Sequence, residues 1–531
     1  TPNTFNIVAC TGVPTLALKL RIKAGLTTAA FGAISGQDCA PATQAATDVM
    51  DLVTLIEGDN MFSTTVIPRG NTRIVGAGSS TWMPYVAGQP WVNYITKITV
   101  DGITAFDCTG KRNIKFDSFG IHSANGVASA YGSDAGFQTN SNGFEITNTE
   151  GIEINNMAFM GLYRGIVANE FSDGGEAMMW KLDNFIAADC ETVIKIGTDA
   201  SAPVSPAFLS RDFMVTNCRI ALHCRRMMDV HYTDGATLDN LRFFQSFQDS
   251  IRFRKSPFIT MGEVTLFETN TNSLTFTDCS KISASSLTVS RAGGYTNTTP
   301  WATRTAITLT RCSTVNIQGN VESPGGKAAQ ITDCDNVKMD VAIETPFFTN
   351  GNAAAGGAGA IEVTTSSNTH VDAVMNGETY YHSVGSDYQS SLSLTGDIIS
   401  KSYANTKRAY GLDKSDRTVL HELGSARAIN GGVSSAYKTI KVLVPNSKSL
   451  VSRSFTCQET GISLRVGANF WTGGLIAEPN GETTTFERKV IYSNATGSDV
   501  LHQVTLEYYN TTGSLINIPA GTKTSFAMSV E

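Results

Sequence analysis

Apolar residues recur along this chain at regular intervals. The step is 28 positions three times and then 23 positions twice, at Met157, Phe185, Phe213, Leu241, Val264 and Leu287. A chain that returns an inward side chain to the same place at such steps winds into stacked turns, which is the pattern of a solenoid. The spacing therefore predicts a parallel β-helix.

The repeating unit is itself strand-like. Five segments share one frame: 144–154, 251–261, 274–284, 307–317 and 329–339. Each consists of a short alternating stretch, a tight turn with one small residue, and a second alternating stretch, and alternation with a period of two buries one face of a strand. No helical pattern interrupts these units, which excludes the crossover helices of a βα-barrel. We expect an all-β fold, a single-stranded, right-handed parallel β-helix over residues 29–370.

A helix is predicted at the start of the coil. Residues 1–28 form a lead-in, and an amphipathic stretch then runs from about Pro41 to about residue 57. Val49, Val53 and Ile56 share one face of such a helix. Pro41 suits a first helical turn and the glycine at position 58 suits a stop. We expect this helix to cap the open end of the β-helix and to protect its exposed backbone.

The repeating strand pattern weakens beyond residue 370. Residues 371–434 are polar and rich in Ser and Tyr, and we expect them to connect two modules. From 435 to 531 short alternating strands return between turn residues at roughly regular spacing. That spacing predicts a C-terminal antiparallel β-sandwich.

Composition excludes several classes of function. Hydrophobic residues make up 41% and charged residues 16% of the 531, and the net charge is −7 with no basic cluster, which argues against nucleic acid as a partner. An anionic ligand is not excluded, because a local arginine cluster can outweigh a weakly negative net charge. No apolar run approaches the roughly 20 residues of a membrane span. The start lacks both Met and the layout of a signal peptide, so we expect residues upstream to be missing.

The cysteines follow the repeat. Cys279, Cys312 and Cys334 take the rung position that Ser256 and Thr149 hold in sister units. The position therefore needs a small side chain at a tight turn, and we expect structural thiols there. Unpaired stacked thiols also favour assembly in a reducing compartment.

One N-terminal motif and the architecture together carry a family resemblance. Phe31-Gly-Ala with Gly36 and Asp38, a capping helix, and a strand that ends in Gly76-Ala-Gly resemble the pectate-lyase-like β-helices, in particular the tailspikes of tailed bacteriophages. The resemblance covers roughly residues 29–370.

The resemblance implies partners and a place. Tailspikes are homotrimers that bind, and usually cleave, the O-antigen or capsule of a bacterial host. They are made in the host cytoplasm and sit on the virion tail through an N-terminal head, which we expect to be missing from this chain. It further implies that residues 371–434 make trimer contacts and that 435–531 clamp the trimer or bind carbohydrate.

Two consecutive rungs end alike. Val321-Glu322-Ser-Pro and Ile343-Glu344-Thr-Pro would stack the two glutamates one strand spacing apart, ~4.8 Å between backbones. Carboxylates that close repel, so one should keep its proton near neutrality, and an acid beside a base is what glycosidic cleavage requires. Glu268 is the reserve partner. The alternative is a solvated turn glutamate that repeats because the turn repeats.

An insertion supplies aromatic side chains. The step from Leu287 to Val321 is longer than the other steps, and the surplus contains Tyr295 and Trp301. Exposed aromatic rings suit sugar stacking, so we expect these residues, with Arg291, to bind substrate. Trp301 packing against a neighbouring subunit is the alternative.

A second cluster suits elimination chemistry. Arg225, His231, Tyr232 and Asp234 lie close in sequence. Arginine neutralises uronate carboxylates, and Tyr or His can act as base and acid in β-elimination. A salt-bridge patch between chains is the alternative.

No cofactor or metal site is predicted. The seven histidines are not spaced as metal ligands. A Ca²⁺ site is not excluded, because Asp183, Asp212 and Asp239 could supply carboxylate ligands. These aspartates lie near a column formed by Asn156, Asn184 and Asn240, which we interpret as hydrogen bonding along stacked turns.

Three functions remain in competition. The first is endoglycosidic hydrolysis of O-antigen or capsule. The second is a lyase acting on an acidic capsule, and the third is a receptor-binding spike that holds sugar without cutting it.

Overall fold

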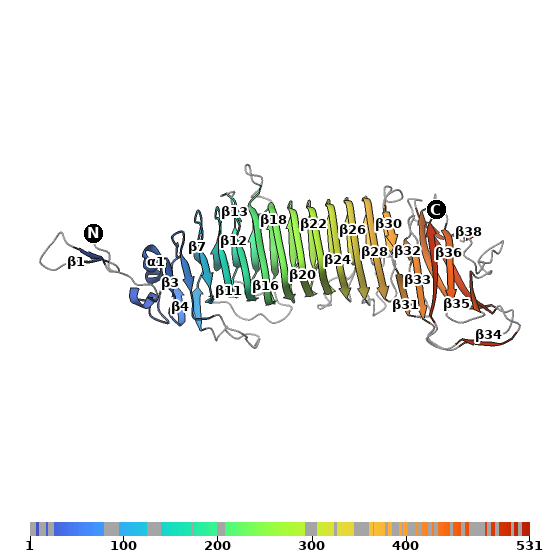
Figure 1. The fold of residues 1–531 in the computed structure, drawn as a ribbon, viewed down its shortest axis with the longest axis horizontal. Coiled ribbons are helices and arrows are strands. Elements are labelled where there is room, and N and C mark those ends of the chain that lie inside the picture. Colours follow the sequence, from blue (N-terminus) through green and yellow to red (C-terminus); the bar gives the residue numbers. More distant parts are fainter. Residues whose placement is uncertain are drawn as a thin grey trace. The chain divides into compact units, whose positions relative to one another are not determined.

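The chain divides into two compact units, Thr1–Leu274 and Thr275–Glu531. The computed structural model describes residues 7–9, 17–19, 26–78, 95–124, 140–170, 175–198, 208–292, 305–322, 327–344, 361–364, 366–376, 381–384, 392–395, 397–401, 409–411, 417–422, 427–429, 434–445, 450–457, 462–466, 484–485, 490–493, 499–510, 514–518 and 523–530. Each unit is described by itself below (Figure 1).

A short helical region precedes the coil. An antiparallel pair, β1 (Ile7–Ala9) and β2 (Ala17–Lys19), is followed by the 3-10 helix η1 (Thr28–Phe31) and by α1 (Ala40–Val49). The Asp38 carboxylate accepts the backbone N–H of Ala40 at 3.1 Å, and Pro41 occupies the first turn of α1, where its missing N–H costs no hydrogen bond.

The predicted capping helix exists but is shorter than expected. It ends at Val49 because Met50 is extended, so the expectation that Val53 and Ile56 share its apolar face is wrong. Val53 instead lies in β3 (Leu52–Thr54), which pairs in parallel with β5 (Arg73–Val75). The β-branched pair Val53-Thr54 fits a strand better than a helix, and pairing with the next rung decides between them.

The first unit is a coil of parallel strands in two sets. One set contains β3, β4 (Gly58–Phe62), β5, β6 (Thr96–Val100), β8 (Lys115–Asp117), β9 (Gly120–Ser123), β11 (Glu153–Met160), β13 (Ala177–Met178), β14 (Lys181–Ala188), β16 (Ser210–Leu222), β18 (Thr233–Phe244) and β20 (Pro257–Thr269). The other contains β7 (Thr104–Asp107), β10 (Asn142–Glu145), β12 (Arg164–Ala168), β15 (Thr192–Ile196), β17 (Arg226–His231) and β19 (Ile251–Arg254). From β14 on, the chain alternates between the sets, one strand from each per rung. The predicted parallel β-helix is confirmed.

Left-handed residues make the corners. Many non-glycine residues here have positive φ, and Asn156, Asn184, Asn217 and Asn240 adopt it within their long strands at 51–55°. Asparagine tolerates this conformation better than most residues, which explains its repetition at one corner. Between the corners, alternate side chains face inward and form a core of stacked aromatic rings, in which Phe106 lies parallel to Phe144 at 5.6 Å.

The register corrects one member of the apolar series. Met157 pairs with Phe185 as the spacing predicts, and Val264 pairs with Leu241. Phe185, however, pairs with Cys218, because the chain has more residues between β15 and β16 than between β12 and β13. Phe213 therefore lies in another column, where its ring stacks on Trp180 at 4.6 Å.

The second unit continues the same pattern with its own strands. One set contains β22 (Ser280–Ala292), β24 (Ser313–Glu322), β26 (Asp335–Glu344), β28 (Ser367–Asn376), β30 (Leu392–Thr395), β31 (Asp397–Lys401) and β33 (Arg417–Glu422). The other contains β23 (Thr305–Thr310), β25 (Lys327–Thr332), β27 (Ile361–Thr364) and β29 (Tyr381–Val384). β21 (Leu274–Thr277) spans the boundary between units. Parallel pairing reaches β33, well past residue 370, although the sequence frame is weak there.

The predicted thiol column lies at one turn of this coil. The backbone N–H of Cys312 donates to Cys334 Sγ at 3.3 Å, and each thiol bonds the carbonyl two residues before it. Ser256 makes the same bond, from its Oγ to the Arg254 carbonyl at 2.7 Å, which explains why Ser and Cys interchange. The thiol of Cys279 beside it and burial raise the pKa of Cys312 to about 12, so this thiol is inert. The eight cysteines whose side chains the structure describes are all free and buried.

The C-terminal strands are mostly antiparallel. They are β32 (Ala409–Gly411), β34 (Arg427–Ile429), β35 (Ser434–Pro445), β36 (Leu450–Cys457), β37 (Ile462–Val466), β38 (Thr484–Thr485), β39 (Val490–Ser493), β40 (Asp499–Asn510), β41 (Ile516–Ile518) and β42 (Lys523–Val530). β40 pairs antiparallel with β35, β37 and β39, and β42 pairs antiparallel with β33 and β36. The two-layer packing of a sandwich stays a prediction.

The Trp180–Phe213 stack provides a test of the core. Trp180 is 1% exposed, and its Nε1 donates to Ser210 Oγ at 2.9 Å. We expect Trp180→Ala to lower the free energy of unfolding by about 3–5 kcal/mol, since it leaves a cavity and removes one of the two hydrogen bonds of the Ser210 hydroxyl. Met214→Ala, at an exposed neighbour, is the control and should cost less than about 1 kcal/mol. Equal denaturation midpoints for the two variants, measured by circular dichroism, would contradict this register.

Candidate functional site

The glutamates of the repeated strand ending lie in register. Glu322 closes β24 and Glu344 closes β26, and the two strands pair in parallel with Glu322 opposite Glu344. Their backbones are thus one strand spacing apart, ~4.8 Å. Val321 is buried, so alternation turns Glu322 outward, where it is partly exposed and accepts a hydrogen bond from Asn320 Nδ2 at 3.0 Å. The predicted stacking is seen, and the catalytic roles stay a prediction.

The reserve glutamate has a different environment. Glu268 lies near the end of β20 in the first unit. Its backbone is left-handed and its side chain is buried, with 4% of the residue exposed. Gln245 Nε2 donates to its carboxylate at 2.9 Å. Arg291, predicted to bind substrate, is exposed near the end of β22 in the second unit. Tyr295 and Trp301 lie outside the described residues.

The four residues of the proposed elimination cluster have different partners. Arg225 lies 3.9 Å from Glu191, and Asp234 lies 3.9 Å from Arg211. The Tyr232 hydroxyl accepts a hydrogen bond from Lys255 at 2.7 Å. His231 is buried and contacts Asp229 at 3.1 Å. Each of the four residues therefore forms an ion pair or hydrogen bond with a different neighbour.

Asp229 on β17 is the centre of a buried network of ion pairs, in the set of strands that contains β15, β17 and β19. Register places it between Lys195 on β15 and Arg252 on β19, which approach its carboxylate at 2.6 and 2.7 Å. Burial opposes ionisation, but the bonds from His231 and Arg252 and the charge of Lys195 outweigh it and hold the pKa of Asp229 far below its usual range. A 2% exposed carboxylate with this many cations is a structural element, because removing it would leave buried positive charges unpaired.

A second pair of stacked carboxylates was not predicted. Asp107 on β7 pairs in register with Glu145 on β10. Asp107 accepts the backbone N–H of Thr109 at 2.9 Å, and Glu145 accepts that of Thr147 at 3.2 Å. Burial, with the Asp107 carboxylate nearby, raises the pKa of Glu145 to about 7. The signal was present in the sequence as an acid followed two residues later by threonine, repeated in neighbouring rungs.

The asparagine column is a hydrogen-bonded ladder, as interpreted from the sequence. Asn184 Nδ2 donates to Asn156 Oδ1, and Asn156 Nδ2 donates to Asp117 at 2.8 Å. A second ladder contains Asn217, which the sequence reasoning missed. Asn240 Nδ2 donates to Asn217 Oδ1 at 2.8 Å, and Asn217 Nδ2 donates to Asp183 at 2.7 Å. Each ladder therefore starts at an aspartate.

Hydrogen bonds explain the lowered pKa of Asp183, the aspartate at the start of the second ladder. Burial opposes ionisation of Asp183, but the hydrogen bonds from Thr216 and Asn217 and the charge of Lys181 outweigh it and lower its pKa. The Asp239 carboxylate accepts a hydrogen bond from the backbone N–H of Glu263 at 2.9 Å. Within the part of the chain that the structure describes, no group of three or more His, Cys, Asp or Glu side chains is arranged to hold a metal ion.

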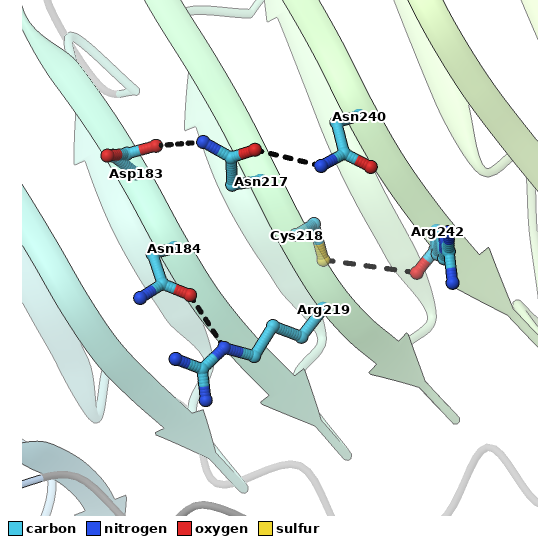
Figure 2. Close-up of a pocket in the computed structure, with 7 residues that line it drawn as sticks. All are labelled: Asp183, Asn184, Asn217, Cys218, Arg219, Asn240 and Arg242. Carbon is cyan, nitrogen blue, oxygen red and sulfur yellow. Dashed lines mark hydrogen bonds between the residues drawn. The ribbon is translucent and has the colours of Figure 1, made fainter.

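A groove runs beside these ladders (Figure 2). Its volume is about 550 Å³, and it is lined by Asp183, Asn184, Asn217, Cys218, Arg219, Asn240 and Arg242. The lining residues come from β14, β16 and β18 of the first unit. Amide and guanidinium groups from neighbouring rungs give the groove several hydrogen-bond donors beside the Asp183 carboxylate.

Comparisons with known proteins concern the fold. No protein-family model matches the chain, and no curated protein matches it. It is similar to the N-terminal fragment of gene product 12 of bacteriophage phi29, at 13% identity over 74% of this chain and 70% of that chain, with a TM-score of 0.44.

Two tailspike structures are also similar. The tailspike gp49 of the Acinetobacter baumannii bacteriophage Fri1, a capsular polysaccharide depolymerase, is 12% identical over 100% of this chain and 90% of that chain, with a TM-score of 0.32. The tailspike of the E. coli bacteriophage HK620, solved with a pentasaccharide, is 11% identical over 94% and 93%, with a TM-score of 0.37. Among the described residues, no helix is long and apolar enough to cross a membrane.

Glu145 provides a pH-dependent test of the stacked acids. Its folded pKa, about 7, lies above its usual 4.5, so its contribution to stability is fully present below pH 4.5 and is lost as the pH rises through 7. Glu145→Gln removes this loss. We expect the variant to gain roughly 3 kcal/mol relative to wild type between pH 4.5 and 8, measured by urea unfolding. Glu153→Gln, at an exposed glutamate of β11, is the control. An equal pH dependence in wild type and Glu145→Gln would show that Glu145 ionises normally.

Proposed function

We propose that this chain is a bacteriophage tailspike that binds a bacterial surface polysaccharide, O-antigen or capsule, and cleaves it by endoglycosidic hydrolysis. Glu322 and Glu344 act as acid and base. The observation that carries the proposal is their register on neighbouring strands, which follows from the pairing of β24 with β26.

The chemistry follows from the spacing. Two carboxyl groups on neighbouring strands can flank one glycosidic bond, one as acid and one as base. The protonated member donates to the leaving oxygen of the glycosidic bond, and the ionised member acts as nucleophile or activates water. A carboxyl separation of ~5 Å gives retention of configuration and ~6.5–9.5 Å gives inversion, so the stereochemistry of the product reports the separation.

The surroundings of Glu322 fit this role better than those of the other acids. Asp229 is buried among cations, and Glu268 is buried against Gln245. Glu322 is partly exposed, and among the described residues its one hydrogen bond comes from Asn320 of its own strand. Solvent and substrate therefore reach it more easily.

The proposal includes the assembly that the sequence resemblance implies. The chain works as a homotrimer on the virion tail, attached through an N-terminal head, and meets its polysaccharide outside the host cell. Residues 435–531 clamp the trimer or bind carbohydrate. Tyr295, Trp301 and Arg291 bind the substrate.

The reaction products separate the competing functions. Hydrolysis releases reducing ends without an unsaturated sugar. A lyase using Arg225, His231 and Tyr232 would leave an unsaturated uronate, which absorbs in the ultraviolet. Binding without either product would identify a receptor-binding spike.

The acid–base assignment has a direct test. Glu322→Gln and Glu344→Gln should each reduce polysaccharide cleavage by about 10²–10⁴-fold, because the amide can neither donate nor accept the transferred proton. Glutamine keeps the size of the side chain, so unfolding temperature and assembly state should not change. Glu57→Gln, at an exposed glutamate of the first unit, is the matched control and should keep full activity. Full activity in both active-site variants would remove this assignment.

A further inference from the structure

The groove of Figure 2 contains a β-bulge. Phe185 pairs with Cys218, but the next residue of β14, Ile186, pairs with Ile220, so β16 has one extra residue at Arg219. The same extra residue appears against β18, where Leu241 pairs with Cys218 and Phe243 with Ala221. Bulges bend a strand and re-aim side chains, and they occur often beside functional sites.

The bulge gives Arg219 an unusual set of contacts. Its Nε donates to Asn184 Oδ1 at 2.6 Å, across the neighbouring strand. Figure 2 shows the side chain extended toward Asn184 with its terminal amino groups beyond that bond. Within the described residues, no carboxylate pairs with Arg219, although Arg211 on the same strand is paired with Glu176 at 2.8 Å. The guanidinium is fixed in orientation and keeps its two terminal amino groups for a ligand.

Charge in the groove favours a singly charged anion. Among the lining residues, Arg219 and Arg242 are positive and Asp183 is negative, which leaves one net positive charge in a chain whose net charge is −7. Arg242 lies 3.9 Å from Glu263, and both side chains are more than half exposed, so this weak pair is easily displaced. A planar guanidinium with two parallel N–H groups matches the geometry of a carboxylate.

The asparagines supply the neutral part of the site. Asn217 and Asn240 each use one amide N–H in the ladder, and each keeps a second one. Their orientation is fixed because each ladder is anchored at an ionised aspartate. Fixed amides at successive rungs suit the hydroxyls of successive sugars, with little loss of side-chain freedom on binding.

We propose that this groove is a binding subsite for an acidic polysaccharide, in which Arg219 takes the carboxylate of a uronic acid and Asn217 and Asn240 bind the hydroxyls beside it. The inference rests on the proposed function and specifies its substrate class. It assigns the recognition of charge to the first unit, on residues other than the proposed catalytic pair.

The test uses the whole chain and a panel of purified capsules and O-antigens. Each polymer is assayed as isolated and after chemical reduction of its carboxylates to alcohols. We expect the polymers that bind to be acidic, and we expect reduction to weaken binding at least tenfold. Binding should also weaken as salt increases, because the contact is between charges.

Variants locate the contact. Arg219→Ala should weaken binding of the acidic polymer about tenfold or more and raise KM with little change in kcat, while Arg219→Lys should fall between Ala and wild type. Arg112→Ala, at an exposed arginine of the same unit outside the groove, is the control and should bind as wild type does. The unfolding temperature of each variant reports whether the bulge remains intact.

The outcomes separate this inference from the function on which it rests. If the polymer that is bound and cleaved is neutral, or if Arg219→Ala weakens the native and the carboxyl-reduced polymer equally, the acidic subsite is wrong while the hydrolase stands. If acidic polymer binds Arg219→Ala as tightly as wild type, the subsite is also wrong. If no polymer of the panel is bound or cleaved, both proposals fail.

Discussion

The constraint on which this structure depends is the in-register parallel pairing of each strand with the strand one rung later. Once that pairing is fixed, every side chain has a defined neighbour ~4.8 Å away in the next rung, inside the coil or outside it. Met157 meets Phe185 in the core for this reason, and Glu322 meets Glu344 at the strand ends. The fold thus turns residues far apart in sequence into continuous columns.

Columns of like groups create problems that the chain solves in different ways. Lys195, Asp229 and Arg252 alternate in sign along one column, and the buried charges neutralise one another. Asparagine amides carry both donor and acceptor, so a column of them is self-complementary. Stacked acids have neither solution, and at Glu145 burial, together with the Asp107 carboxylate in register beside it, raises the pKa to about 7.

Much of the fold could be predicted because local patterns and long-range pairing agree. The turn column of Cys279, Cys312 and Cys334 and the register of the two strand-end glutamates follow from aligning the rungs. The prediction at Phe213 failed because additional residues between β15 and β16 lengthen the step from one rung to the next by five, from 28 to 33. A fixed step cannot reveal such a change, and the same error concealed Asn217, which lies 23 residues before Asn240.

The candidate sites were less predictable than the fold. Arg219 is notable only because a bulge aims it across β14, and no local sequence feature marks that bulge. Arg225, His231, Tyr232 and Asp234 are close in sequence, but alternation and the corners between strands give each a different partner. Helix α1 ended early for a similar reason, since pairing between rungs outweighed the helical pattern at Val53.

Cross-linking between rungs tests the central claim most directly. Glu322→Cys with Glu344→Cys should form a disulfide readily on oxidation, because paired residues on neighbouring parallel strands lie within the Cα separation of ~4.4–6.8 Å that a disulfide needs. Glu322→Cys with Lys338→Cys is the control, since Lys338 pairs with Asn316 and lies several residues away along the strand. Peptide mass spectrometry of the full chain should find the 322–344 link and little of the 322–338 link. Equal amounts of both, or no 322–344 link, would contradict the register on which the columns depend.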